Sequence, residues 1–118
     1  MKCIINGKKY DTDTARLVCV AENRGVNEFR HERESLYRKR TGEYFIYGEG
    51  GPLSQYARSG YGGGWTSGES IRPLTAEEAR KWAEGDCSMA IYQTKRGTWV
   101  DGGMDVDEYE AEFGEVEE

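Results

Sequence analysis

Short apolar runs separated by turn signals occupy the start of the chain. Asn6-Gly7 is a strong tight-turn dipeptide, so residues 3–5 and 8–10 are predicted to pair around it as a small hairpin. Residues 17–21 (LVCVA) are continuously apolar, a pattern that fits either a helix or a buried strand.

The centre of the chain predicts a second hairpin. Residues 35–40 and 43–48 flank Thr41-Gly42, and the second segment is rich in the aromatic and β-branched residues that favour strands. Tyr44 and Ile46 would face one side of the sheet and the intervening aromatic residues the other, so both faces are expected to be covered.

A glycine-rich segment follows at residues 48–68, where little apolar periodicity remains. We expect a loop region there, with room for one helical turn at residues 53–58. Residues 70–72 fit a short strand, which Pro73 is expected to close.

Residues 74–84 carry the clearest helical pattern. Thr75 as N-cap and Glu78 three residues later form a capping box, and Gly85 suits the end of the helix. The apolar positions that share one helical face, and should therefore dock on the sheet, are Ala79, Trp82 and Ala83.

The C-terminal part predicts a third hairpin and a last helix. Residues 89–93 and 98–100 flank a basic tip, and residues 105–113 fit a helix that Asp105 caps and Gly114 ends. The apolar stripe expected to dock this helix, leaving an acidic outer face, consists of Val106, Tyr109 and Phe113. Together these elements predict an α+β fold in one domain over residues 1–118, a small and mainly antiparallel sheet with a packed helix and an acidic C-terminal helix.

Charge is distributed unevenly along the 118 residues. Residues 1–100 hold all 16 Lys and Arg and 13 Asp and Glu, whereas residues 101–118 hold nine acids and no base. This balance argues against direct nucleic-acid binding, which needs clustered cations, but it suits binding to a basic protein surface. Acidic termini also simply solvate a surface helix, and that explanation stays open.

The composition also bears on location and redox state. No apolar run approaches the length of a membrane span, and no N-terminal apolar core of signal-peptide length is present. We therefore expect a cytoplasmic protein that does not bind a membrane. Cys3, Cys19 and Cys87 are odd in number and lack C-x-x-C spacing, which favours reduced thiols.

No motif selects a catalytic, cofactor or metal site. His31 is the sole histidine and lacks the H-E-x-x-H spacing of a zinc site, so a surface histidine is expected. The glycine-rich stretches lack the Lys-Ser or Lys-Thr of a phosphate-binding loop, and the terminal acids lack the order of an EF-hand. We therefore expect no cofactor, no metal and no enzymatic activity.

Several segments taken together resemble a family of small acidic proteins from prophages and mobile elements of gut bacteria, some associated with anti-CRISPR activity. The segments are INGKKYDTDTA, ESLYRKRTGEYFIYGEGGPLSQYA, ESIRPLTAEEARKWAE and DEYEAEFGEVEE, whereas residues 86–104 look like an insertion. The resemblance implies stoichiometric binding to a CRISPR-Cas effector in the bacterial cytoplasm, with block of nucleic-acid binding or cleavage. It assigns no catalytic residue.

Effectors of the Cas9 type hold nucleic acid in basic channels, so an acidic domain could occupy such a channel as a DNA mimic. The acids predicted to do so are Asp105, Asp107, Glu108, Glu110, Glu112 and Glu115, with Glu117 and Glu118 continuing a flexible extension.

Two other classes of function stay open. A non-enzymatic interaction module of a phage or mobile element would use exposed aromatics, among which Tyr61 and Trp65 are the main candidates, joined by Tyr47 and Tyr56. Tyr61 and Trp65 could instead anchor the glycine-rich loop to the core. A thiol enzyme would need one of the cysteines beside His31.

Overall fold

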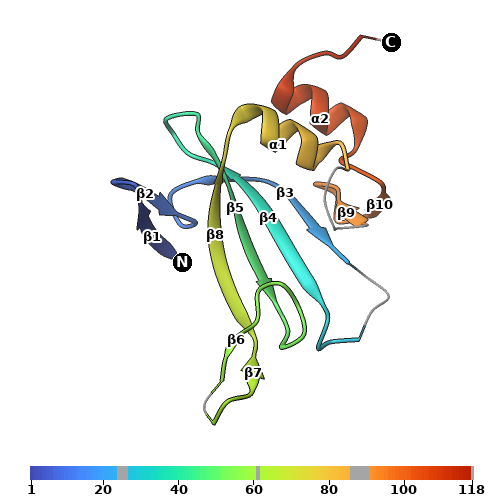
Figure 1. Cartoon of the computed structure of the whole chain (residues 1–118). Helices are drawn as coiled ribbons and strands as arrows, with labels where there is room; N and C mark the ends of the chain where they lie inside the picture. Colours follow the sequence, from blue (N-terminus) through green and yellow to red (C-terminus); the bar gives the residue numbers. More distant parts are fainter. Residues whose placement is uncertain (24–26, 61, 86–90, 118) are drawn as a thin grey trace.

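The computed structural model describes residues 1–23, 27–60, 62–85 and 91–117, and its architecture is α+β as predicted. A six-stranded antiparallel sheet forms the centre, with strand order β10-β9-β3-β4-β5-β8 (Figure 1). Its strands are β3 (Arg16–Glu22), β4 (Glu32–Arg38), β5 (Tyr44–Gly50), β8 (Gly68–Leu74), β9 (Ile91–Gln93) and β10 (Trp99–Asp101).

Two small ribbons flank this sheet. The predicted N-terminal hairpin is confirmed as β1 (Lys2–Ile5) and β2 (Lys8–Asp11), and Asn6 and Gly7 both have positive φ at its turn. Inside the predicted loop region, β6 (Arg58–Ser59) and β7 (Trp65–Thr66) pair as a short arm that extends beyond the lower end of the sheet in Figure 1.

The central hairpin is confirmed as β4 paired with β5, and the apolar run at residues 17–21 lies in strand β3. Two other expectations are wrong. β8 continues through Pro73 to Leu74, because β8 is an edge strand and a missing N–H on its outer side breaks no ladder. Residues 53–58 form consecutive turns instead of a helical turn, and they enter β6 at Arg58.

Helix α1 (Ala76–Ala83) covers one face of the sheet, as predicted, with its capping box formed by Thr75 and Glu78. Trp82 is 3% exposed and meets the Tyr92 ring edge-on at 5.1 Å between centroids. Helix α2 (Val106–Phe113) lies at the same end of the molecule (Figure 1). The predicted third hairpin is present as β9 and β10, while Met89 and Ala90 lie outside the described residues.

The opposite face of the sheet is covered by the β1–β2 hairpin. Phe45 is fully buried there between Tyr10, edge-on at 5.5 Å, and Tyr37, stacked at 5.3 Å. The sheet is therefore apolar on both faces, as the alternation in residues 43–48 predicts. No helix among the described residues is long and apolar enough to cross a membrane.

Candidate protein-binding surfaces

Helix α2 is held to the body by its own sequence. The Asp105 side chain accepts a hydrogen bond from the Glu108 backbone N–H at 3.3 Å, and Gly114 ends the helix at φ +97°. Tyr109 and Phe113 pack on the core, in line with the predicted stripe. Val106 does not: it is 68% exposed, because only one side of this short helix reaches the body.

Three of the six acids predicted to bind a partner stabilise the fold instead of facing solvent freely. Glu112 accepts two hydrogen bonds from Arg16 Nη2, at 2.7 and 2.9 Å, and its side chain is 8% exposed. Glu108 accepts from the Lys95 backbone N–H at 3.0 Å, and Asp105 is the N-cap described above. Changing these three would disturb α2 as well as any partner contact.

A groove of about 410 Å³ lies between α1, α2 and the segment after β10, and one of the three remaining predicted acids lines it. Glu110 lines this groove, Asp107 is exposed on the same helix, and Glu115 is exposed just beyond it. The apolar groups of the groove are Ala83, Met104, Val106, Tyr109 and Val116. The result is an apolar floor with an acidic rim.

Two further acids on this rim were not selected from the sequence. Asp101 at the end of β10 and Glu84 at the end of α1 both line the groove. The Tyr109 hydroxyl donates to Glu84 Oε2 at 2.6 Å, and burial together with this carboxylate raises the pKa of Tyr109. Tertiary packing alone brings them together, since 17 positions separate these two acids.

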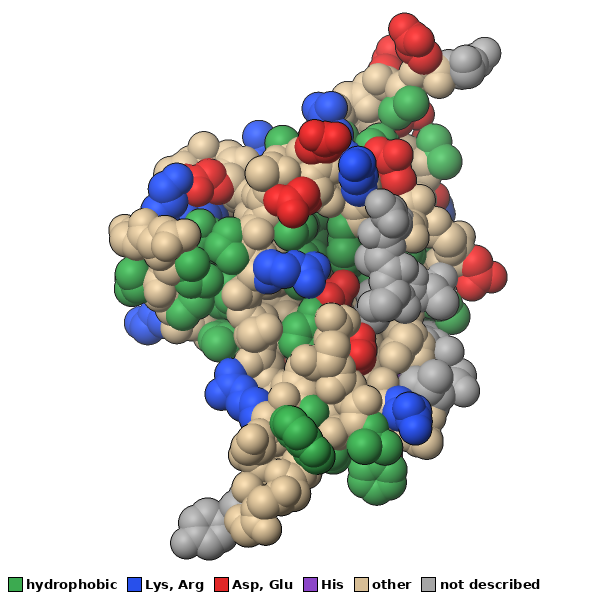
Figure 2. Space-filling model, viewed as in Figure 1, with side chains coloured by type: hydrophobic (Ala, Val, Ile, Leu, Met, Phe, Trp, Pro, Cys, Tyr) green, Lys and Arg blue, Asp and Glu red, His purple; other side chains and the backbone are tan. Residues whose placement is uncertain are grey.

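Glycines build the closed end of the groove. Gly85 has φ +103°, and a side chain there would collide with the Gly102 carbonyl oxygen. The Met104 backbone N–H donates to the Ala83 carbonyl at 2.8 Å and fixes the segment to the end of α1. We call this surface, lined by Glu84, Asp101 and Glu110, the acidic groove. Figure 2 shows acidic side chains at this end of the molecule, with Lys and Arg side chains among them.

The predicted aromatic residues have different environments. Trp65, on β7, is 66% exposed and does not anchor the arm to the core. Tyr56 lies against Gly48 and donates to the buried Glu34, whereas Tyr47 donates to Glu69 and Glu49. Tyr61 lies outside the described residues. Trp65 is therefore the one described member of this set that keeps a largely exposed ring.

Two further exposed apolar residues were not selected as binding candidates from the sequence. Phe29 is 53% exposed and Leu53 is 55% exposed, and the Leu53 backbone N–H donates to the Phe29 carbonyl at 2.7 Å. Figure 2 shows hydrophobic side chains emerging at the end of the molecule opposite the acidic groove. We call Phe29, Leu53 and Trp65 the apolar end.

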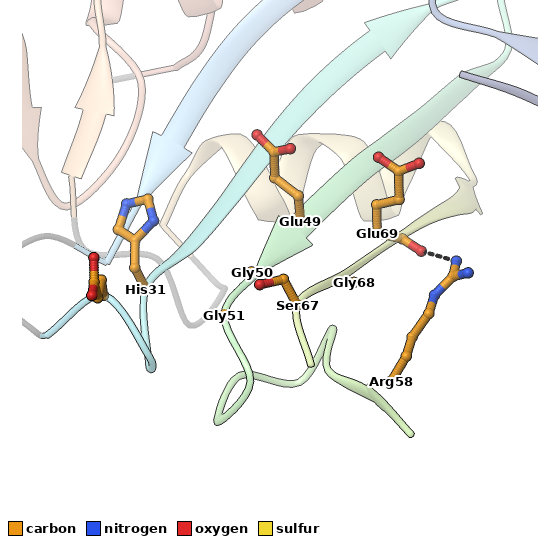
Figure 3. Close-up of a pocket in the computed structure, with 9 residues that line it drawn as sticks. His31, Glu49, Gly50, Gly51, Arg58, Ser67, Gly68 and Glu69 are labelled. Atoms are coloured by element: carbon orange, nitrogen blue, oxygen red, sulfur yellow. Dashed lines mark hydrogen bonds between the residues drawn. The ribbon is translucent and has the colours of Figure 1, made fainter. Parts of the chain in front are cut away.

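A polar cleft of about 530 Å³ lies between the strand ends at this side of the molecule (Figure 3). Glu49 and Glu69 are cross-strand partners on its wall, and Arg58 donates to the Glu69 backbone carbonyl. His31 stands at its other side, apart from Arg58 in the view.

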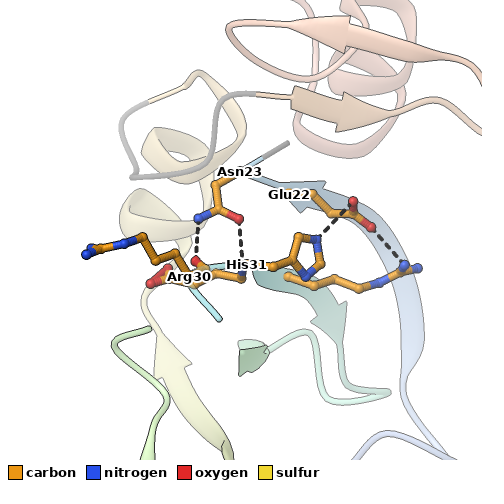
Figure 4. Close-up of polar contacts among 6 residues, drawn as sticks. Glu22, Asn23, Arg30 and His31 are labelled. Carbon is orange, nitrogen blue, oxygen red and sulfur yellow. Dashed lines mark hydrogen bonds and ion pairs between the residues drawn. The ribbon is translucent and has the colours of Figure 1, made fainter. Parts of the chain in front are cut away.

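His31 lies among polar contacts that connect the end of β3 to the start of β4 (Figure 4). Its Nε2 lies 3.3 Å from Glu22 Oε2, and Arg33 donates to the other oxygen of that carboxylate at 2.9 Å. The Asn23 side chain bonds the backbone of Arg30 and Glu32, which orders the approach to β4.

The thiol chemistry considered from the sequence finds no support at Cys19. This residue is 5% exposed, and burial raises the pKa of its thiol to about 12, with the nearby Glu108 adding to the effect. Cys3, on strand β1 of the N-terminal hairpin, is half-buried, and Cys87 lies outside the described residues. Within the described ranges, no group of three or more His, Cys, Asp or Glu side chains could hold a metal ion.

Comparison with known proteins gives no relative: no family model, no curated protein and no solved structure matches this chain.

Proposed function

We propose that this protein is a non-enzymatic binding protein whose acidic groove and terminal acids occupy a basic surface of another protein. The observation that carries the proposal is the acidic groove itself, which combines an apolar floor with the carboxylates of Glu84, Asp101 and Glu110. The segment 101–118 holds nine acids and no base, and those of its acids that make no ion pair with the body add to the negative charge around the groove.

The groove suits a segment rich in Lys and Arg. The aliphatic stems of those residues pack on apolar surface while their charged ends reach acids at the border. Val106 and Val116, which are 68% and 61% exposed, offer such a surface beside the acids of the groove. A one-signed field acts over about a Debye length, roughly 8 Å at physiological salt, and speeds encounter with a basic partner.

The partner in this proposal is a CRISPR-Cas effector of the bacterial cytoplasm. Such effectors hold nucleic acid in positively charged channels, so a stoichiometric protein ligand with exposed carboxylates would compete with the phosphate backbone. The family resemblance of the sequence supports the same assignment. The acids in contact would be Asp101, Asp107, Glu110 and Glu115, with Glu117 beyond them.

The test measures DNA cleavage by a panel of purified effectors in the presence of the chain. The variant Asp101→Asn/Asp107→Asn/Glu110→Gln removes two charges of the groove and one exposed charge of α2, and leaves Glu112 and the helix cap in place. Asp13→Asn/Glu28→Gln/Glu77→Gln is the matched control, because it removes three exposed acids away from the groove. Inhibition that the first variant loses and the control keeps is expected; equal inhibition by both contradicts the role of the groove.

Point variants are better than truncation in this test. Removing the chain after Gly103 would also remove Met104, which is 8% exposed in the core, and the Glu112 carboxylate that pairs with Arg16. Loss of binding by such a fragment would follow from unfolding alone.

A second candidate function, binding through exposed apolar side chains, is favoured by the exposure of the apolar end. Trp65 is 66% exposed, and large exposed aromatics often anchor protein interfaces. On this alternative, Trp65→Ala abolishes partner binding and the triple rim variant retains it. On the main proposal the two results are reversed.

A further inference from the structure

A basic hollow lies beside the turn that joins β4 to β5, in a protein whose formal charge is −6. It measures about 620 Å³ and lies between the start of β3 and that turn. We call it the basic cradle, and its polar lining consists of Thr14, Arg16, Arg38, Lys39, Arg40 and Thr41.

The sheet register creates an anion site at one edge of the cradle. Arg16 and Arg38 are direct cross-strand partners, and like charges in that position repel one another. A carboxylate resolves the repulsion here: Glu112 binds Arg16 through both oxygens, and Arg38 Nη1 lies 3.8 Å from Oε2. This arginine pair therefore already holds an oxyanion supplied by the chain itself.

The rest of the cradle keeps an excess of positive charge. Lys39 lies 3.9 Å from Glu43 and 4.2 Å from the centre of the Tyr10 ring, which leaves its side chain 16% exposed. Glu43 also pairs with Lys8 at 3.2 Å. Arg40 is exposed and has no hydrogen bond or ion pair with any described residue.

Counting these groups gives the sign of the local field. Five cations lie here, counting Lys8 with the four of the cradle, and two carboxylates, Glu43 and Glu112, pair with them. Four of these cations line the hollow, which also offers two hydroxyls, Thr14 and Thr41, so the lining keeps a net positive charge. Arginine forks and hydroxyl donors at this spacing are typical of phosphate recognition.

We propose that the basic cradle binds a compact polyphosphate, such as the diphosphate or triphosphate group of a nucleotide. A water molecule takes about 30 Å³ in the liquid, so the hollow has room for several phosphate groups. Glu112 lies against the same arginines, and the acids of α2 that follow it in space would repel a long strand that continued past the cradle along this helix. The positive surface is local, which favours a short ligand over a nucleic-acid backbone.

The test is calorimetric titration of the full chain with tripolyphosphate at low ionic strength. Arg40→Ala is expected to weaken binding by about tenfold, the order of one charge-assisted hydrogen bond. Arg96→Ala removes an equally exposed arginine from the turn between β9 and β10 and should leave binding unchanged. Glu112→Gln frees the arginine pair from its internal carboxylate and should tighten binding.

Three results would overturn the proposal. The first is absence of binding by the unaltered chain, and the second is equal weakening by Arg40→Ala and Arg96→Ala, which means diffuse charge attraction. The third is tighter binding of a single-stranded oligonucleotide than of tripolyphosphate, which assigns the cradle to a nucleic-acid backbone. Thermal unfolding of each variant identifies those that still fold; Arg40 and Arg96 lie on exposed turns and are expected to be neutral for stability.

Discussion

Replacing Glu34 by Met is expected to cost a large part of the stability of this protein. Glu34 is 2% exposed on β4, and two side-chain donors reach its carboxylate from different segments. Trp82 Nε1 of α1 donates to Oε1 at 2.9 Å, and the Tyr56 hydroxyl donates to Oε2. Arg72 is the nearby cation, at 3.8 Å, but its side chain is 52% exposed and contributes little.

The magnitude follows from the groups left behind. Met has nearly the shape of Glu, so no large cavity forms and the main effect is two orphaned donors. A buried donor without a partner costs about 1–3 kcal/mol, which gives about 2–6 kcal/mol for the pair. Domains of this size unfold with about 5–15 kcal/mol, so the loss is readily measured.

A double-mutant cycle with Tyr56→Phe isolates one of the two contacts. In the unaltered chain, Tyr56→Phe removes a hydrogen bond to a charged group, worth about 1.5–3 kcal/mol. In the Glu34→Met background the hydroxyl has already lost its acceptor, so the same change should cost almost nothing.

The assay is urea unfolding of the four proteins, followed by tryptophan fluorescence. Additive effects, within about 0.5 kcal/mol, would show that Tyr56 and Glu34 do not interact. A cost below about 1 kcal/mol for Glu34→Met would refute the view that the carboxylate holds α1 and the segment after β5 on the sheet.

Three further predictions concern stability. Burial and neighbouring carboxylates raise the pKa of Tyr47 and of Tyr56, so the folded state keeps these protons to a higher pH than the unfolded chain does. The contribution of the two hydroxyls to stability is therefore fully present below about pH 10, the pKa of the unfolded chain, and is lost as the pH rises above it. Urea midpoints measured from pH 8 to 11 should fall less steeply in Tyr56→Phe than in the unaltered chain. Thr75→Ala removes the N-cap of α1 and should cost about 1 kcal/mol in the same unfolding assay, whereas no cost would mean that the cap is replaced by water. Gly85→Ala places a side chain against the Gly102 carbonyl at positive φ and should lower the melting temperature, while an unchanged melting temperature would show that the groove segment shifts freely.

Local signals predicted the elements well where one residue type decides the backbone. Asn6-Gly7, Thr41-Gly42 and the capping box at Thr75 each specify a turn or a helix start without help from distant residues. Whether residues 17–21 form a helix or a strand, and whether the last strand before α1 ends at Pro73, depends on the neighbouring strands of the sheet. A buried central position and an edge position are properties of the assembled sheet, which no local pattern contains.

The acids illustrate the same limit for the site. Sequence separated the acidic terminus from the rest of the chain but could not divide its members by role. Glu112 pairs with Arg16, 96 positions away, and Glu84 joins Asp101 only because the end of α1 meets the segment after β10. Phe29 and Leu53 were missed since single apolar residues in loops have no periodicity to mark them.

The measurement that tests the central claim most directly compares binding to one effector in two states. A purified CRISPR-Cas effector is immobilised either with its nucleic-acid channel empty or with guide and target DNA bound, and the affinity of the chain is measured for both. If the acidic groove occupies the basic channel, affinity for the filled state is expected to be at least about tenfold weaker, because the same cations are already paired with phosphates. Equal affinity for the two states would contradict the account, since the acidic surface would then bind elsewhere or make no contact.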